Sequence, residues 1–228
     1  MGLGSSFGIA AETGNNIVTD GLVFYVDAAY KKSYPGDGST WTDIINNSAG
    51  TITNATFNSN GYFDFDGSGD RIDFSAHDNF NFGDGDFTIA IWWRYTGSNF
   101  NGYPYLLDMR GSGNVIVIYP FTSNRIEVYT NGNQWNTGSE TLTVNNWFHV
   151  VYCRVGTTRY LYVNNSLTNS QSSYTTTLVE GKVRIGARNN GNQVWTGNIP
   201  IVQLYKGKGF TSSDVSQNYN AQKERFGF

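Results

Sequence analysis

Residues 147–165 read WFHVVYCRVGTTRYLYVNN, with two runs rich in β-branched and aromatic residues on either side of Gly156-Thr157-Thr158. Two such runs joined by a short turn that contains glycine are typical of a β-hairpin. Successive side chains of a strand point to opposite faces, and both faces of the first run are largely apolar. One face carries Trp147, His149, Val151, Cys153 and Val155, and the other carries Phe148, Val150, Tyr152 and Arg154. We therefore expect a central strand covered on both sides, with Asn164-Asn165 turning the chain after the second run.

Other segments alternate in the same way. Residues 61–74 place Phe63, Phe65, Ile72 and Phe74 inward on two runs joined by Gly67-Ser68-Gly69, which predicts a second hairpin. Residues 87–95 predict another core strand, and shorter strands are predicted at residues 22–27, 105–107, 115–119, 125–130, 183–187 and 201–205. Residues 211–225 predict a helix capped by Ser212 or Ser213. Many short strands without intervening helices indicate an all-β sandwich.

The composition is that of one aromatic, weakly charged domain. The chain has 228 residues, of which 16% are aromatic and 14% charged, and its net charge is −3. We expect an arm at residues 1–20, a sandwich at 21–210, and a helix and tail at 211–228. The negative charge argues against nucleic acid as a partner, and no apolar run is long enough to predict membrane insertion or a secretory signal. Cys153 has no second cysteine to pair with, so we expect a buried thiol.

The central hairpin also carries a family resemblance. Trp147-x-His149-Val150, a turn and then 161–164, Leu-Tyr-Val-Asn, resemble the core hairpin of laminin-G-like domains in the concanavalin A-like lectin and glucanase superfamily. The resemblance extends to residues 21–28, 87–92 and 197–199, and it implies a jelly-roll sandwich of two antiparallel sheets. The sequence departs from the family at Asn165, where glycine is usual, and at Pro200, where an aspartate often stands.

A narrower resemblance concerns function. The opening at residues 21–27, the Asn-rich turns and the ending at residues 218–226 resemble domains in structural proteins of tailed bacteriophages, including those of cyanobacteria. This implies a non-enzymatic virion subunit, a capsid decoration or fibre-associated protein on the virion surface, that forms homo-oligomers and binds capsid or tail proteins. The candidate docking residues are Phe7, Ile9, Ile17, Tyr219, Phe226 and Phe228. The alternative for residues 1–20 is a terminus without a docking role.

Catalysis and metal binding are not predicted. Glucanases of this superfamily need paired carboxylates, typically Glu-x-Asp-x-Glu on one strand, and the glutamates here are isolated in the sequence. A glycoside hydrolase is therefore the less favoured alternative. Oxygen-bearing residues recur between Asp64 and Asp70 as in a calcium loop, but the twelfth position is Ser75 instead of a bidentate glutamate. We expect no cofactor, and a calcium ion at the rim through Asp27, Asp78 or Asp108 stays open. His77 and His149 lie too far apart in the sequence to suggest a metal cluster.

One set of residues suggests sugar binding. Aromatic rings stack on the apolar faces of sugars and arginine forks bind hydroxyl groups. The candidates are Trp92, Arg94, Tyr129, Tyr152, Arg154, Tyr160, Tyr162 and Arg184. If they share an open face, the chain is either a virion protein that adheres to host polysaccharide or a stand-alone extracellular lectin. If loops such as residues 31–60 cover them, they are a second core layer.

Overall fold

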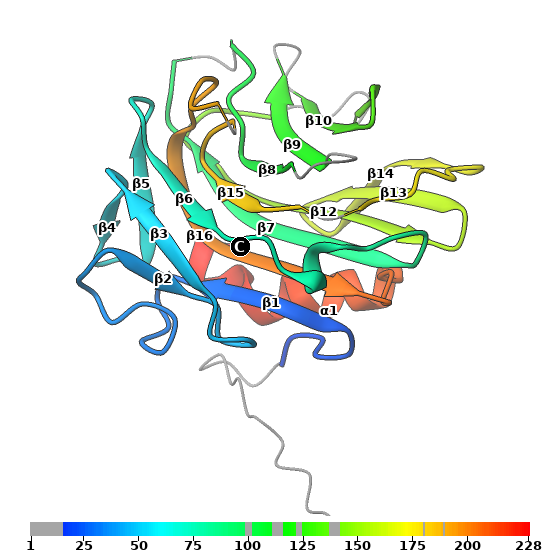
Figure 1. The fold of residues 1–228 in the computed structure, drawn as a ribbon, viewed down its shortest axis with the longest axis horizontal. Coiled ribbons are helices and arrows are strands. Elements are labelled where there is room, and N and C mark those ends of the chain that lie inside the picture. Colours follow the sequence, from blue (N-terminus) through cyan, green and yellow to red (C-terminus); the bar gives the residue numbers. More distant parts are fainter. Residues whose placement is uncertain are drawn as a thin grey trace, which may run out of the picture.

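A computed structural model describes residues 16–98, 102–110, 116–121, 125–136, 142–179, 181–188 and 190–228. Two eight-stranded sheets pack face to face, and every pairing between the described strands is antiparallel (Figure 1). A short helix, α1 (Ser212–Gln222), lies across the outer side of one sheet. The predicted all-β sandwich with a C-terminal helix is confirmed.

The first sheet is built around two long neighbouring strands, β7 (Phe87–Tyr95) and β16 (Thr196–Lys206). Its order is β14 (Ser166–Gln171), β13 (Thr158–Val163), β12 (Trp147–Val155), β7, β16, β5 (Tyr62–Asp66) and β4 (Thr56–Asn58), and β1 (Leu22–Asp27) also pairs with β16. β16 is long enough to pair with β5 through its first half and with β1 through its second. Pro200 lies in the register shift between these halves, where the lack of a backbone N–H interrupts the ladder.

The second sheet faces the first across the core. Its order is β11 (Asn133–Asn136), β10 (Arg125–Thr130), β9 (Ile116–Phe121), β8 (Leu107–Met109), β15 (Val183–Ile185), β6 (Arg71–Phe74), β3 (Ala49–Thr53) and β2 (Thr40–Thr42). A one-turn 3-10 helix, η1 (Asp78–Phe80), follows β6. Inward residues of both sheets form one apolar cluster, which includes Ile91, Trp93 and Val150 from the first sheet and Ile72 and Ile118 from the second.

The central hairpin forms as predicted. Gly156 and Thr157 join β12 to β13, and the Gly156 φ of +57° is in the left-handed region that glycine adopts without strain. Asn164 and Asn165 have φ values of +46° and +70° and turn the chain into β14, which matches their tolerance of this region. Val150 faces the sheet interface and Val151 faces the helix, so both faces of β12 are covered.

The second predicted hairpin, residues 61–74, is wrong. β5 belongs to the first sheet and β6 to the second. Gly67-Ser68-Gly69 therefore connects the two sheets at the edge of the core, and the two strands do not pair with each other. Asp70 stabilises the crossing by accepting a hydrogen bond from the Asp66 backbone N–H at 2.7 Å. The inward faces were nevertheless predicted correctly, since alternation shows which side of a strand faces the core but does not select the neighbouring strand.

The helix is predicted correctly, but its N-cap lies one residue earlier than the predicted Ser212 or Ser213. Thr211 is the N-cap, and its hydroxyl accepts from the Asp214 N–H while Asp214 accepts from the Thr211 N–H, a reciprocal capping box. Val215 then joins the apolar cluster that includes Val151 of the first sheet. After α1, η2 (Lys223–Phe226) ends the described helical segment.

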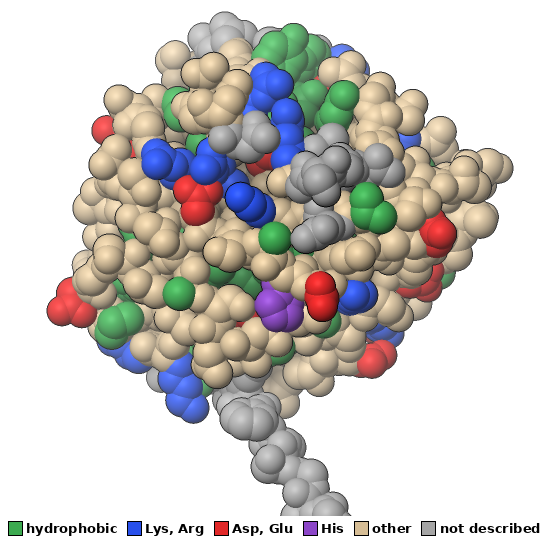
Figure 2. Space-filling view, viewed as in Figure 1, with side chains coloured by type: hydrophobic (Ala, Val, Ile, Leu, Met, Phe, Trp, Pro, Cys, Tyr) green, Lys and Arg blue, Asp and Glu red, His purple; other side chains and the backbone are tan. Residues whose placement is uncertain are grey.

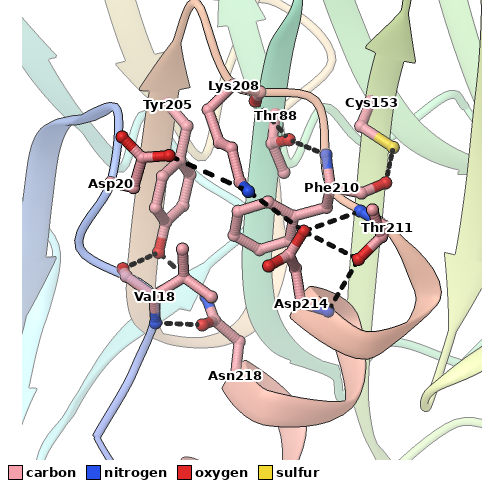
Figure 3. A network of polar contacts seen from close by, with 10 residues as sticks. All are labelled: Val18, Asp20, Thr88, Cys153, Tyr205, Lys208, Phe210, Thr211, Asp214 and Asn218. Carbon is pink, nitrogen blue, oxygen red and sulfur yellow. Dashed lines mark hydrogen bonds and ion pairs between the residues drawn. The ribbon is translucent and has the colours of Figure 1, made fainter.

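Residues 16–20 run beside the helix instead of extending from the domain. Figure 3 shows the Val18 N–H donating to Asn218 Oδ1 at 2.8 Å, and the Tyr205 hydroxyl donating to the Val18 carbonyl at 3.1 Å. Ile17 and Val18 are both buried. The predicted arm at residues 1–20 therefore needs correction at its C-terminal end, which belongs to the packed body. In the described part of the chain, no helix has the length and apolar character needed to cross a membrane.

Candidate functional site

The outer face of the second sheet presents a row of side chains across neighbouring strands. The backbone register places Tyr129 beside Val117, Val117 beside Asp108, Asp108 beside Arg184 and Arg184 beside Asp73. These side chains point away from the core because the residues that alternate with them, such as Ile118, Leu107 and Ile185, lie in it. We call this row and its neighbours the outer face. Figure 2 views the molecule from this side and shows Lys and Arg side chains gathered on it.

Ion pairs link the middle of the outer face. Asp73 accepts from Arg71 Nε at 3.2 Å through one oxygen and pairs with Arg184 Nε through the other. Arg184 also donates to the Arg188 backbone carbonyl at 2.9 Å. Asp108 is buried and accepts from Arg110 Nε at 3.0 Å. These contacts fix two aspartates and hold the arginines in defined positions at the surface.

An aromatic group adjoins the ion pairs. The Tyr105 and Tyr119 rings stack at 5.3 Å with an interplanar angle of 15°, and Arg110 donates to the Tyr105 hydroxyl at 3.1 Å. The Tyr119 hydroxyl donates to Glu127 Oε2 at 2.8 Å, and burial together with this carboxylate raises the pKa of Tyr119. The stacked Tyr105 and Tyr119 rings are almost fully buried and form the floor of the outer face.

Exposed aromatic surface borders that floor. Tyr103 has 41% of its surface exposed, and its ring contacts Tyr119 at 5.8 Å and Phe121 at 5.2 Å. Phe121 and Tyr129 are half-buried and pack against the same cluster. The outer face therefore combines ring surfaces with fixed guanidinium groups, an arrangement that can hold a flat, polyhydroxylated ligand.

The predicted sugar-binding residues do not share one face. Tyr129 and Arg184 lie on the outer face described above, whereas Trp92 is fully buried beneath the C-terminal segment. Tyr152 lies in the core between the sheets. Arg154 is also buried and donates to backbone carbonyls, one of them that of Thr176 at 2.8 Å. The grouping was wrong because Trp92 pairs in register with His149, and so shares its side of the sheet with His149 and not with Tyr152.

The remaining three candidates lie on the helix side of the first sheet. Tyr160 and Tyr162 pack with the cluster around Cys153. Arg94 lies over the Trp147 ring at 4.7 Å and donates to Asn198 Oδ1 at 2.7 Å. They are therefore separated from Tyr129 and Arg184 by the thickness of the sandwich.

Sequence reasoning missed most of the outer face. It did not assign Tyr105, Arg110, Tyr119, Glu127 or Arg188 to a sugar-binding role. Alternation could have found both Tyr119, which follows the inward Ile118, and Glu127, which stands between the inward Ile126 and Val128. Arg188 and Arg110 follow the ends of strands, where the two-residue period gives no information.

The predicted docking residues pack largely on the chain itself. The Trp92 ring is contacted by Phe226 at 4.2 Å, by Tyr219 at 5.6 Å and by Phe228 at 5.9 Å. Ile17 belongs to the same cluster. A partner-docking role is therefore corrected for Ile17 and Phe226, which are buried within the domain, while Phe228 is 47% exposed. Phe7 and Ile9 lie outside the described residues.

The open question of a rim calcium ion can be examined at Asp27. Its Oδ1 accepts from Arg225 at 2.7 Å and from the Ala29 N–H at 2.9 Å, and its Oδ2 accepts from the Tyr25 hydroxyl. A guanidinium group thus takes the position of a cation at this carboxylate. Asp108 is likewise paired with Arg110. Among the residues that the structure describes, no cluster of three or more His, Cys, Asp or Glu could hold a metal ion.

Comparison with known proteins agrees with this architecture. The family described as "Concanavalin A-like lectin/glucanases superfamily" matches residues 66–216. The chain belongs to this superfamily. No curated protein matches the sequence. The superfamily part of the predicted resemblance is confirmed.

Two solved structures of the same fold are informative. A Trypanosoma rangeli sialidase in complex with sialic acid aligns with a TM-score of 0.72 and 18% identity, over 94% of this chain and 35% of the sialidase chain. The botulinum neurotoxin serotype D binding domain aligns with a TM-score of 0.69 and 17% identity, over 89% of this chain and 52% of the other. This chain therefore spans about a third of one protein and about half of the other. At these identities the likeness shows the fold alone.

The expectation of a bacteriophage virion subunit is wrong. It depended on a resemblance in the opening strand, the turns and the final residues, whereas the fold aligns with a sialidase and with a toxin binding domain. The structure also gives those final residues another role, because Tyr219 and Phe226 stack on Trp92 of the same domain.

Proposed function

We propose that this superfamily member is a carbohydrate-binding module that holds a glycan on the outer face of the second sheet and does not cleave it. The observation that carries this proposal is the contrast between the two outer sides of the sandwich. α1 and residues 16–20 cover the first sheet, whereas the second sheet presents ring surfaces beside fixed arginines.

The chemistry of the outer face supports sugar binding. Tyr129 and Tyr103 offer ring surfaces on which the apolar face of a sugar ring stacks. Arg110 and Arg184 are already oriented by their contacts with Tyr105 and Asp73, so little side-chain freedom is lost when they bind hydroxyl groups. The rigid floor of stacked tyrosines keeps these groups in place.

The carboxylates support binding without hydrolysis. Most glycosidases need one carboxyl group free to protonate the glycosidic oxygen and a second to act on the opposite side of the sugar, although sialidases use a tyrosine as the nucleophile. Both oxygens of Asp73 are engaged by arginines, Asp108 is buried against Arg110, and Glu127 accepts from Tyr119. The sialidase likeness covers 35% of that enzyme, so its activity is not carried over to this chain.

Glycan binding by the purified chain tests the proposal. We expect Tyr129→Ala to weaken binding on a glycan array about tenfold or more, because the variant loses a stacking surface. Tyr160→Ala is the matched control, since Tyr160 is equally half-buried but lies on the first sheet. A wild-type chain that binds no glycan contradicts the binding proposal. Release of new reducing ends from a bound glycan contradicts the non-catalytic part.

A further inference from the structure

The middle of the outer face carries an excess of positive charge. Among the described residues, the outward side chains of β6, β15 and β8 and those just after β15 and β8 include four arginines and two aspartates. The arginines are Arg71, Arg110, Arg184 and Arg188, and the aspartates are Asp73 and Asp108. The chain as a whole has a net charge of −3, so this concentration of arginine opposes its overall charge. Figure 2 shows the gathered basic side chains on this side.

The two aspartates do not compensate all four arginines. Asp73 uses one oxygen for Arg71 and the other for Arg184, and Asp108 pairs with Arg110. None of the described ion pairs includes Arg188. One guanidinium group on the face therefore has no carboxylate partner among the described residues.

Arg188 is held in place with unused hydrogen-bonding capacity. It opens the loop between β15 and β16, and its Nη1 donates to the neutral Gln193 side chain at 2.8 Å. Its Nε is buried and has no hydrogen-bond partner within the described structure. The Gln193 carbonyl accepts from the Tyr105 N–H at 3.0 Å, so this loop borders the aromatic floor. A planar guanidinium that is partly desolvated and lacks a counter-ion is suited to a carboxylate or sulfate group.

We propose that the glycan bound by the outer face is anionic. Arg188 binds its carboxylate or sulfate group, and Tyr103 and Tyr129 hold the neighbouring sugar ring. This inference rests on the proposed glycan-binding function and specifies its ligand class. Arg71 and Arg184 add to the positive potential but share Asp73, so the net attraction for an anion centres on the Arg188 side of the row.

The alternative is that Arg188 only holds the loop through Gln193. In that case the charge of the ligand does not matter, and replacing Arg188 lowers the thermal midpoint without changing the preference among glycans. Arg188→Lys separates the two roles, because it keeps the charge but loses the planar fork.

The experiment compares glycans that differ in charge alone, by isothermal titration calorimetry. The pairs are 3′-sialyllactose and lactose, polygalacturonate and its methyl ester, and a sulfated galactan and its desulfated form. The first two pairs report on carboxylates and the third on sulfate. Arg188→Gln and Arg188→Lys are compared with Lys223→Gln, which removes one positive charge from the helix side of the molecule. Thermal midpoints confirm that each variant is folded.

We expect the wild type to bind at least one charged member more tightly than its neutral counterpart. Arg188→Gln should weaken that binding about tenfold, because it removes one charge-assisted contact. Arg188→Lys should weaken it less, and Lys223→Gln should leave it unchanged. Binding should also weaken from about 0.1 M to about 1 M salt, because the Debye length shortens from about 10 Å to about 3 Å.

Two results overturn the inference in different ways. Equal binding of charged and neutral members, or wild-type affinity in Arg188→Gln, refutes the anionic ligand at Arg188 and leaves the glycan-binding function standing. No binding to any member at any salt concentration refutes the proposed function and the inference with it.

Discussion

His149 shows how a single residue can make stability depend on pH. Its ring stacks on Trp92 at 4.9 Å and lies 5.9 Å from the Tyr219 ring, between the first sheet and the C-terminal helix. Both ring nitrogens are buried without a hydrogen-bond partner in the described structure. Burial lowers the pKa of His149 to about 3 from its usual 6.5, because the protonated ring would be desolvated there.

This depressed pKa predicts a loss of stability in acid. Between pH 6.5 and 3 the unfolded chain binds a proton at His149 that the folded chain does not bind. The free energy of unfolding therefore falls by about 1.4 kcal/mol for each unit by which pH drops through this window. His149→Phe keeps a ring on Trp92 and removes the proton site. From pH 6.5 to 4.5, measured by urea unfolding, the free energy of unfolding should fall in both proteins. We expect the fall to be about 2 to 3 kcal/mol smaller in this variant than in wild type.

The other histidine provides the control for this prediction. His77 is exposed and caps the short helix η1 through Nδ1. His77→Phe removes the other histidine and leaves the His149 ring on Trp92, so a comparison of the two variants separates His149 from the rest of the chain. If wild type and His149→Phe lose the same free energy over this range, His149 is not the residue that titrates.

At the same scale, sequence reasoning named two residues of the outer face. Tyr129 and Arg184 were among the sugar-binding candidates, and the structure places both there, while their binding of a sugar stays a prediction. Trp92 was grouped with them because alternation distinguishes the two sides of one strand but not the outer sides of two sheets. Arg188 could not be found from the pattern, because its proposed role depends on its standing outside the described ion pairs, and these depend on where Asp73 and Asp108 lie in space.

At the scale of elements, patterns within one strand were predictable and partners were not. The strand at residues 125–130 and the turn at Asn164-Asn165 formed as expected, because residue type and local backbone preference decide both. The pairing of β5 with β16, and of β6 with β15, depends on contacts between residues more than a hundred positions apart. Strand alternation carries no information on such partners.

β16 gives the element-scale prediction. Gly197 has a φ of +145°, and a Cβ atom built there would lie 2.1 Å from the Arg94 backbone oxygen of the neighbouring strand β7. Since backbone atoms on both strands would have to shift, Gly197→Ala should lower the free energy of unfolding by more than about 3 kcal/mol. Gly132→Ala, at a φ of +84° with open space around it, should cost about 1 to 2 kcal/mol. Equal midpoints in denaturant for the two variants would show that β16 can move away from β7.

At the scale of the whole molecule, the two outer sides of the sandwich differ in what covers them. α1 and η2 lie on the first sheet, and residues 16–20 join them through Val18 and Asn218 (Figure 3). Sequence reasoning treated both termini as surfaces for a partner, since they carry apolar residues far from the core strands in sequence. The fold uses those residues to cover its own sheet, whereas no described helix covers the second sheet, which carries the proposed ligand site.

This arrangement predicts that stability and glycan binding can be separated by shortening the chain. Ile17 and Val18 are almost fully buried, and burial of such side chains contributes about 1.5 to 3 kcal/mol each. The free energy of unfolding of a chain that begins at residue 21 should therefore be about 3 to 6 kcal/mol lower than that of a chain that begins at residue 16. Glycan affinity, measured well below the unfolding temperature, should be the same for both chains because the outer face lies on the opposite sheet. Equal stability would mean that residues 16–20 do not hold the helix side closed, and a loss of affinity in the folded shorter chain would place the ligand on the first sheet.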